Sequence, residues 1–468
     1  MATTGVNRAI AGAAVVFAGI AATVAPLRAA QDSLPDRVTA CQEWRECQRL
    51  ALEAHARGEY ERFHDLAWRS MQTGPARDPN LMYLLARAQS LSGRPHDAFV
   101  MLGRLAEVGF VTDAATDDDF RAVRQLRQWP ELEAAMTRTT RPADVLPPAV
   151  ARPPNVSPPV VPADVLPTAV GPLPDISRPV FPAAPHVEEA LRIPGTVLGS
   201  AGLAYDRVSS RFVVADAGLR KLMIIDERSR HLVDLVTSAS AGFYDITGLE
   251  IDPSRGDLWV VSAELAATSD QRAGASALHR LQLVSGRPLD RIPIPNDLQP
   301  CRLGDVAVTH EGSVLVLDTM GSRLLRFRPA AHTFAQVARL HLQSPTSVAV
   351  AGERVVYVAH AAGIARVDTV TGRVKPVSSS GDVPLIGFER IRWALDSLVG
   401  IQRLSDGTRR AVHVKIVDAR AVGIDTIDTD LSATDHPVAT VSGNEFYFLV
   451  HQTDGDPGDV VIRRSRMR

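Results

Sequence analysis

A short phrase that recurs six times in the second half of the chain constrains its fold more than any other feature. Each copy joins a small or polar residue and an apolar run to a turn and a second apolar run, as in residues 202–205 and 212–216. The copies begin at residues 202, 248, 305, 347, 390 and 437, so successive starts are 46, 57, 42, 43 and 47 residues apart. A period of about 40 to 50 residues with several short strands per unit is typical of propeller blades.

The six copies predict an all-β six-bladed propeller over residues 187–468. Runs such as 222–226 and 324–327 add a third strand to a unit after a turn. Strands this short bury both faces only when blades stack around an axis. Because the last copy shortens after Val450 and an extended piece at 190–194 precedes the first, we expect the two ends to share one blade.

Residues 31–141 show a helical period instead. The segments that begin at Leu50 and Leu85 align at a 35-residue offset; each ends at a glycine, Gly58 or Gly93, and a second amphipathic stripe follows. Helix, glycine turn and helix at this spacing resemble the tetratricopeptide repeat, so we expect an all-α tetratricopeptide-like domain. The resemblance implies a surface that docks a peptide or protein. The alternative is a packing module that orients the propeller.

Two further segments have different compositions. Residues 1–30 contain Arg8, a short apolar run and then small residues, which predicts a signal peptide cut near Ala29 or Ala30 and a periplasmic or secreted protein. An uncleaved membrane anchor is the alternative.

Residues 142–186 are rich in proline and repeat the hexapeptide Pro-Ala-Asp-Val-Leu-Pro, so we expect a semi-rigid linker.

Charge and cysteine content exclude several classes of partner and scaffold. With 51 basic and 53 acidic side chains, the chain has no electrostatic footprint for nucleic acid or, once the signal is removed, for a membrane. Only three cysteines occur, namely Cys41, Cys47 and Cys301. If the first two share one helix they lie about 9 Å apart, beyond the roughly 7 Å that a disulfide tolerates. We therefore expect three buried cysteines that act as small apolar residues.

Residues 305–327 resemble an NHL repeat, and the whole C-terminal part resembles the six-bladed superfamily that includes the SMP-30/gluconolactonase/LRE group. The resemblance implies that catalytic relatives hold one divalent metal, usually calcium, at the mouth of the central tunnel with a Glu, an Asn and an Asp. Such a metal polarises a lactone carbonyl and helps to activate water. It needs several oxygens that converge on one point.

The corresponding positions of this sequence lack most of those oxygens. Ala201 stands where the group has its first Glu, Thr346 stands at the Asn position, and His360 replaces the Asp. Only Glu389 remains, beside Arg390, where an ion pair is the simpler interpretation. We therefore expect no metal or other cofactor. If calcium binds, Glu389 and Asp305 are its expected ligands.

The register of the repeats places polar residues near one rim of the tunnel. They are the candidate ligand-binding residues Thr247, Asp305, Thr346, Glu389, Arg390 and His436. An imidazole such as that of His436 titrates near neutral pH and is suited to act as a base, but the sequence assigns no catalytic residue. For each rim residue the alternative role is a hydrogen bond between blades.

Two functions fit these patterns. The first is an exported, non-catalytic binding or scaffold protein whose helical repeats and propeller face bind a protein or a small polar ligand. The second is a calcium-dependent lactone or ester hydrolase with a rebuilt ligand set. The missing metal ligands favour the first, and whether the protein is an enzyme stays open.

Overall fold

The fold is that of an α-helical module followed by a β-propeller. The computed structural model describes residues 41–140 and 187–467, apart from residues 42, 76, 194–197, 228–229, 231, 253, 265–273, 382, 430, 432–436 and 452–458. The predicted signal peptide, the proline-rich linker and His436 lie outside the described residues. No described helix is long and apolar enough to cross a membrane.

Two helix pairs form the core of the helical module, as the 35-residue offset predicts. They are α1 (Trp44–Ala56) with α2 (Tyr60–Thr73), and α3 (Pro79–Leu91) with α4 (Pro95–Glu107); the short η1 (Asp118–Phe120), α5 (Arg121–Arg124) and α6 (Trp129–Thr140) follow. The turn glycines Gly58 and Gly93 have φ angles of +71° and +78°, which glycine adopts without steric cost. Asp78 caps α3 by accepting hydrogen bonds from the backbone of Asn80 and Leu81.

The expectation for two of the cysteines is wrong. Cys41 and Cys47 form a disulfide, and their Cα atoms are 5.3 Å apart. The estimate of about 9 Å assumed one helix through both residues, but α1 begins only at Trp44. Cys41 therefore lies in the preceding segment, which folds back toward the first turn of the helix. Cys301 is free and buried, as expected.

The propeller has six blades of antiparallel strands, the fold that the repeats predict. Blades one to three are β2 (Ser200–Asp206), β3 (Arg211–Asp216), β4 (Lys221–Asp226) and β5 (Leu232–Val236); β6 (Asp245–Ile251), β7 (Asp257–Ala263), β8 (Ser276–Gln282) and β9 (Pro288–Pro293); and β10 (Leu303–Val308), β11 (Val314–Asp318), β12 (Arg323–Arg328) and β13 (Thr333–Arg339). The short helix α7 (Ser238–Ala241) and η2 (Asn296–Leu298) lie between blades.

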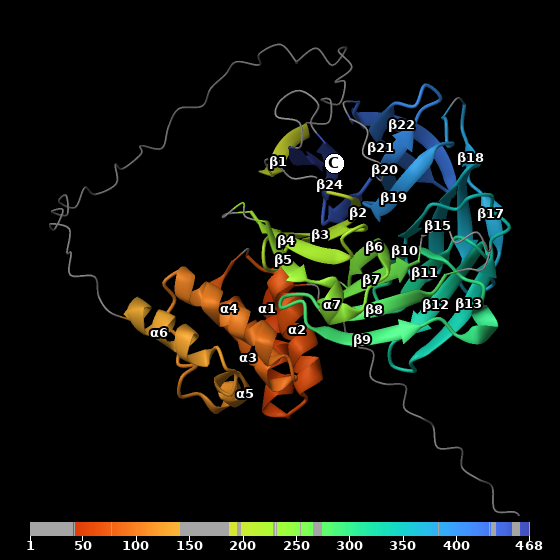
Figure 1. Cartoon of the computed structure of the whole chain (residues 1–468). Helices are drawn as coiled ribbons and strands as arrows, with labels where there is room; N and C mark the ends of the chain where they lie inside the picture. Colours follow the sequence, from red (N-terminus) through yellow and green to blue (C-terminus); the bar gives the residue numbers. More distant parts are fainter. Residues whose placement is uncertain are drawn as a thin grey trace, which may run out of the picture. The chain divides into compact units, whose positions relative to one another are not determined.

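The last three blades complete the ring. They are β14 (Ser347–Val350), β15 (Val355–His360), β16 (Gly363–Asp368) and β17 (Val374–Pro376); β19 (Phe388–Ala394), β20 (Ser397–Arg403), β21 (Arg409–Val417) and β22 (Arg420–Asp428), with β18 (Ser378–Ser379) parallel to β22; and β23 (Ala439–Ser442), β24 (Glu445–His451), β25 (Val460–Arg466) and β1 (Val187–Ile193). Strand β1 pairs with β25, so the prediction that the two ends share a blade is confirmed. In Figure 1 the colours pass around the ring from the first blade to the blue last one.

Each copy of the sequence phrase is the inner part of one blade. The first strands of the blades contact one another in the order β2, β6, β10, β14, β19 and β23, and β23 contacts β2. Small residues are required where these strands approach closely. A Cβ atom on Gly202 would lie 2.8 Å from Cγ of Leu249, and one on Gly248 would lie 3.2 Å from Oδ1 of Asp305. The six inner strands thus form a closed ring around the central channel.

The helical module packs against turns of the first two blades, and both belong to one compact unit, Cys41–Arg468. Asp97 on α4 accepts a 3.0 Å hydrogen bond from the backbone of Ser285, in the β8–β9 turn. The indole of Trp68 on α2, only 2% exposed, lies against Gly256 in the β6–β7 turn. Gly256 has a φ of +67°, and a Cβ atom there would lie 2.7 Å from the indole ring. Both the positive φ angle and the close indole ring therefore require a glycine at position 256.

Candidate functional site

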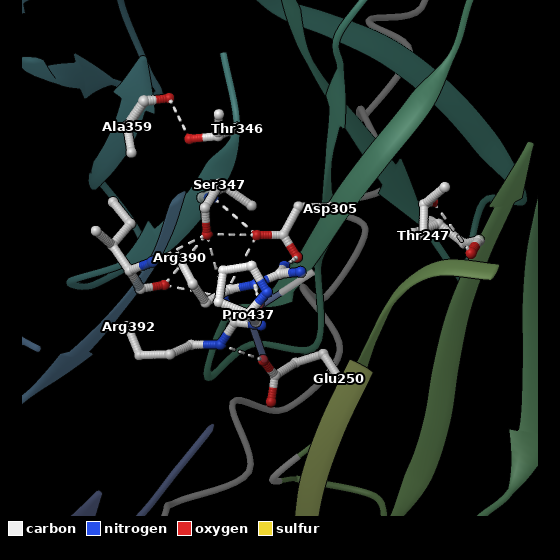
Figure 2. A network of polar contacts seen from close by, with 12 residues as sticks. Thr247, Glu250, Asp305, Thr346, Ser347, Ala359, Arg390, Arg392 and Pro437 are labelled. Atoms are coloured by element: carbon white, nitrogen blue, oxygen red, sulfur yellow. Dashed lines mark hydrogen bonds and ion pairs between the residues drawn. The ribbon is translucent and has the colours of Figure 1, made fainter. Parts of the chain in front are cut away.

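A network of charged and polar side chains connects the inner strands of neighbouring blades (Figure 2). Its centre is Asp305, which β10 places in the channel with no solvent exposure. Oδ1 of Asp305 accepts a 2.7 Å hydrogen bond from Nη1 of Arg390 on β19. Oδ2 accepts hydrogen bonds from the hydroxyl of Ser347 at 2.7 Å, the backbone of Val348 at 3.0 Å and Nη1 of Arg392 at 3.3 Å. One buried carboxylate thus accepts hydrogen bonds from four donors, one at Oδ1 and three at Oδ2.

Two arginines keep this carboxylate ionised. Burial by itself raises the pKa of Asp305, but the positive charges of Arg390 and Arg392 outweigh it, and the net effect is a pKa below the ordinary aspartate value. Burial also lowers the pKa of Arg390, although Asp305 opposes this. Because buried charges are tolerated when they are paired and hydrogen-bonded, the network has the features of a structural ion-pair cluster.

A second carboxylate, Glu250 on β6, lies at the other side of Arg392. Oε2 of Glu250 is 3.6 Å from Nε of Arg392, which makes an ion pair but is too long for a good hydrogen bond. Burial raises the pKa of Glu250, and the charge of Arg392 only partly opposes it. Nε of Arg392 is buried and has no hydrogen-bond partner among the described residues. Figure 2 shows Arg392 extending toward Glu250.

Sequence reasoning missed Glu250, Ser347 and Arg392. A signal for two of them exists: residues 248–251 and 390–393 are the copies of the phrase in which a charged residue interrupts the apolar run. A buried charge on an inner strand needs a partner, because an unpaired buried charge is costly. That partner could not be named, since the sequence repeat does not give the register between blades.

The two threonines predicted at the rim bind backbone atoms of the next blade. The hydroxyl of Thr247 donates to the carbonyl of Leu303 at 2.8 Å, and that of Thr346 donates to the carbonyl of Phe388 at 2.9 Å. Each hydroxyl also lies 3.3 Å from a carbonyl of its own blade. These contacts are hydrogen bonds between blades, the alternative role raised by the sequence.

Among the predicted rim residues that the structure describes, Asp305 and Arg390 are the one pair in contact. Glu389 instead forms a bidentate ion pair with Arg409 of its own blade, with Nε–Oε2 at 2.6 Å and Nη2–Oε1 at 3.2 Å. Glu389 and Asp305, the expected calcium ligands, are thus each held by arginine. Within the described part of the chain, no three His, Cys, Asp or Glu side chains gather in a way that could hold a metal ion. The donor set of the described residues does not fit the calcium site that the resemblance implies.

A cavity of about 460 Å³ lies at the other end of the channel. The predicted rim is formed by the first residues of the inner strands, whereas this cavity is lined by residues from their last positions and the turns beyond, such as 204–208, 250–251 and 392–393. The C-terminal half of α2 contributes Trp68, Arg69, Gln72 and Thr73 to its wall. Glu250 and Arg392 therefore join the buried network to this cavity.

No protein-family model and no curated protein sequence matches the chain. Among solved structures it is similar to the PQQ-bound aldose sugar dehydrogenase of Streptomyces coelicolor, with 12% identity and a TM-score of 0.42 over 61% of this chain and 99% of that chain. It is also similar to a structure described as a putative gluconolactonase, with 13% identity and a TM-score of 0.44 over 62% of this chain and 94% of that chain. A third is virginiamycin B lyase from Staphylococcus aureus, with 12% identity, a TM-score of 0.40 and coverage of 61% and 100%. We draw no conclusion on activity from such distant likenesses.

Proposed function

We propose that this protein is an exported, non-catalytic binding protein that accepts a small ligand at the propeller. The observation that supports this best is the engagement of Asp305 by four donors. A carboxylate that acts as a base or metal ligand needs a lone pair free for the reacting group. Asp305 is fully buried with both of its oxygens engaged by donors, and both oxygens of Glu389 are bound by Arg409.

Export is supported by the disulfide between Cys41 and Cys47. Disulfides persist in oxidising compartments such as the periplasm and the extracellular space, and they are rare in the cytosol. The apolar N-terminal segment of the sequence, with its small residues at 29–30, agrees with the same destination.

Ligand binding is supported by the cavity beside α2. Its volume of about 460 Å³ lies within the range of roughly 300 to 1,000 Å³ that small-molecule sites occupy. The helical module then serves as a packing module that completes one wall of the ligand site.

A ligand screen tests the proposal. The melting temperature of the intact protein is measured with neutral sugars, sugar acids, lactones, esters and short peptides, each with and without calcium. We expect at least one compound to raise the melting temperature, calcium alone to leave it unchanged, and the compound to be recovered chemically intact.

The alternative function gives a different result. Calcium-dependent hydrolysis of a lactone or ester that disappears in Glu389→Ala would establish a hydrolase and overturn the proposal. A screen in which no compound changes the melting temperature would equally count against a small-ligand binding protein.

A further inference from the structure

We infer that the outer part of the fourth blade binds a small polyvalent oxyanion, a compact molecule with two or more phosphate or carboxylate groups, in a basic pocket. The pocket has a volume of about 470 Å³, and its lining consists of Arg354, Arg366, Asp368, Thr371, Arg373 and Lys375. None of these residues lines the cavity beside α2. The inference therefore adds a second site to the proposed function and does not depend on it.

The fold gathers these side chains on one face of strands β16 and β17. Lys375 is the direct partner of Arg366 in the antiparallel ladder, and the backbone N–H of Asp368 donates to the carbonyl of Arg373 at 2.9 Å. Residues two apart along a strand point to the same face, as do direct partners on neighbouring strands. Arg354, from the β14–β15 turn, joins the group through its ion pair with Asp368.

Positive charge exceeds negative charge in the basic pocket. Four of its six residues are basic and only Asp368 is acidic, which gives a formal charge of +3 in a chain whose formal net charge is −2. Oδ2 of Asp368 accepts a 3.0 Å hydrogen bond from Nε of Arg354, and Oδ1 accepts from the backbone of Val370 and Thr371 at 3.0 and 2.8 Å. The one carboxylate is thus already engaged by its own turn and by one arginine.

The other three cations of the basic pocket are unpaired, and two of them face each other. Arg366, Arg373 and Lys375 form no ion pair with the described residues. Like charges directly opposite each other, as Arg366 and Lys375 are, destabilise an antiparallel pair. The acidic residue Glu353 accepts a 2.9 Å hydrogen bond from the backbone of the neighbouring blade and does not line the pocket. An anion bound between the two strands offsets this repulsion.

The unpaired cations are accessible to a ligand. Arg373 and Lys375 are exposed. Arg366 is partly buried, yet none of its side-chain nitrogens is a buried atom without a partner. Its donors therefore reach solvent at the pocket and are free to bind an anion from outside.

The number and type of cations favour an anion with several charged groups. The guanidinium groups of Arg366 and Arg373 each match two oxygens of one phosphate or carboxylate, and Lys375 adds a point charge. Three unpaired cations are better compensated by two or more anionic groups than by one. Since these charges lie at the surface, salt screens their attraction to a ligand over about 10 Å at 0.1 M.

Calorimetric titration of the intact protein tests the inference with pyrophosphate, citrate and acetate, at about 20 mM and about 300 mM sodium chloride. At the lower salt concentration we expect one pyrophosphate or citrate to bind per chain, and acetate to bind at least about tenfold more weakly. At the higher concentration both polyvalent anions should bind at least about tenfold more weakly. The tighter of the two identifies phosphate or carboxylate as the preferred group.

Two results of the titration would overturn the inference. Acetate that binds as tightly as both polyvalent anions would show that several charged groups are not required. Absence of pyrophosphate and citrate binding at the lower salt concentration would show that the basic pocket is not an anion site.

Variants of the two exposed cations locate the site. We expect Arg373→Ala and Lys375→Ala each to weaken binding of the tighter anion at least about threefold, and the double variant at least about tenfold. The matched control is Arg403→Ala, because Arg403 is an exposed arginine at the end of β20 and does not line the pocket. The melting temperature without ligand should stay at the wild-type value in all variants, since the side chains that they remove are exposed.

This inference and the proposed function fail independently. If Arg373→Ala and Lys375→Ala bind the anion as tightly as Arg403→Ala, the assignment of the basic pocket is wrong, whatever the ligand screen finds. If the anion binds and both variants weaken it, the basic pocket stands even when no compound binds at the cavity beside α2.

Discussion

The contacts of Asp305 favour a structural role for the charged residues of the channel. A carboxylate with no solvent exposure is stable only when its charge is compensated and its lone pairs are used, and Arg390, Arg392, Ser347 and Val348 do both. The same contacts hold the carboxylate in place between the blades. A polar residue at the start of an inner strand is thus, at this position, a link between three blades.

Asp305→Asn tests that structural role. The amide leaves the guanidinium groups of Arg390 and Arg392 buried with less negative charge beside them, so we expect the free energy of unfolding to fall by about 3–5 kcal/mol. The measurement is equilibrium unfolding in urea. The control is Glu389→Gln, which breaks a more exposed ion pair and should cost roughly 1 kcal/mol or less. Equal losses in the two variants would show that the network does not stabilise the fold.

At the scale of single residues, the sequence predicts where the channel residues lie but not which of them are in contact. The phrase identifies Asp305 and Arg390 as channel residues because each begins a copy of the repeat. It does not show that they bind each other, since they are 85 residues apart and the register between blades depends on how strands pack. The disulfide was missed for a similar reason: the start of α1 at Trp44, three residues after Cys41, decides the distance between the cysteines.

At the scale of elements, the contact between α4 and the β8–β9 turn joins the helical module to the propeller. Its polar centre is Asp97, which is 3% exposed and accepts a hydrogen bond from the backbone of Ser285. Burial raises the pKa of Asp97 to about 6, although the hydrogen bonds from Ser285 and the charge of Arg94 lower it and Asp257 raises it slightly. The junction therefore contains an acid that titrates near physiological pH.

The pH dependence of stability follows from this raised pKa. The native state binds the proton of Asp97 more tightly than the unfolded chain, so the stability that this group contributes is fully present below about pH 4. It is lost as the pH rises through about 6. Asp97→Asn keeps the acceptor oxygen and removes the titration. We expect the variant to gain up to roughly 3 kcal/mol relative to wild type between pH 4 and pH 7.5, because one pKa unit corresponds to about 1.4 kcal/mol.

Urea unfolding of both proteins at the two pH values measures this change. The central quantity is the difference between variant and wild type, because other acids contribute equally to both. A difference that stays constant from pH 4 to pH 7.5 would contradict the role given to Asp97.

Periodicity predicts elements well and their junctions poorly. The 35-residue helical offset and the six copies of the phrase describe hydrogen-bonded local structure, so the helix pairs, the six blades and the closing strand β1 all follow from them. The junction depends instead on turn residues such as Gly256 and Ser285. Nothing in the local pattern of a turn tells which helix will pack against it.

At the scale of the whole molecule, the two modules share a cavity that neither forms alone. The propeller provides the ends of its inner strands with Glu250 and Arg392, and α2 provides Trp68 and Arg69. Ion pairs engage Asp305 in the channel, whereas the cavity of about 460 Å³ has room for a small ligand. This contrast explains why we place binding at the helical end of the channel and no chemistry at the predicted rim.

The most direct test of a non-catalytic binding protein is to follow one ligand for both binding and change in a single sample. Saturation-transfer NMR of the intact protein with the compounds of the ligand screen, lactones and esters included, does this. We expect saturation transfer to at least one compound, and spectra of all compounds that stay unchanged over a day. Product signals that grow with wild-type protein but not with Glu389→Ala would contradict the account.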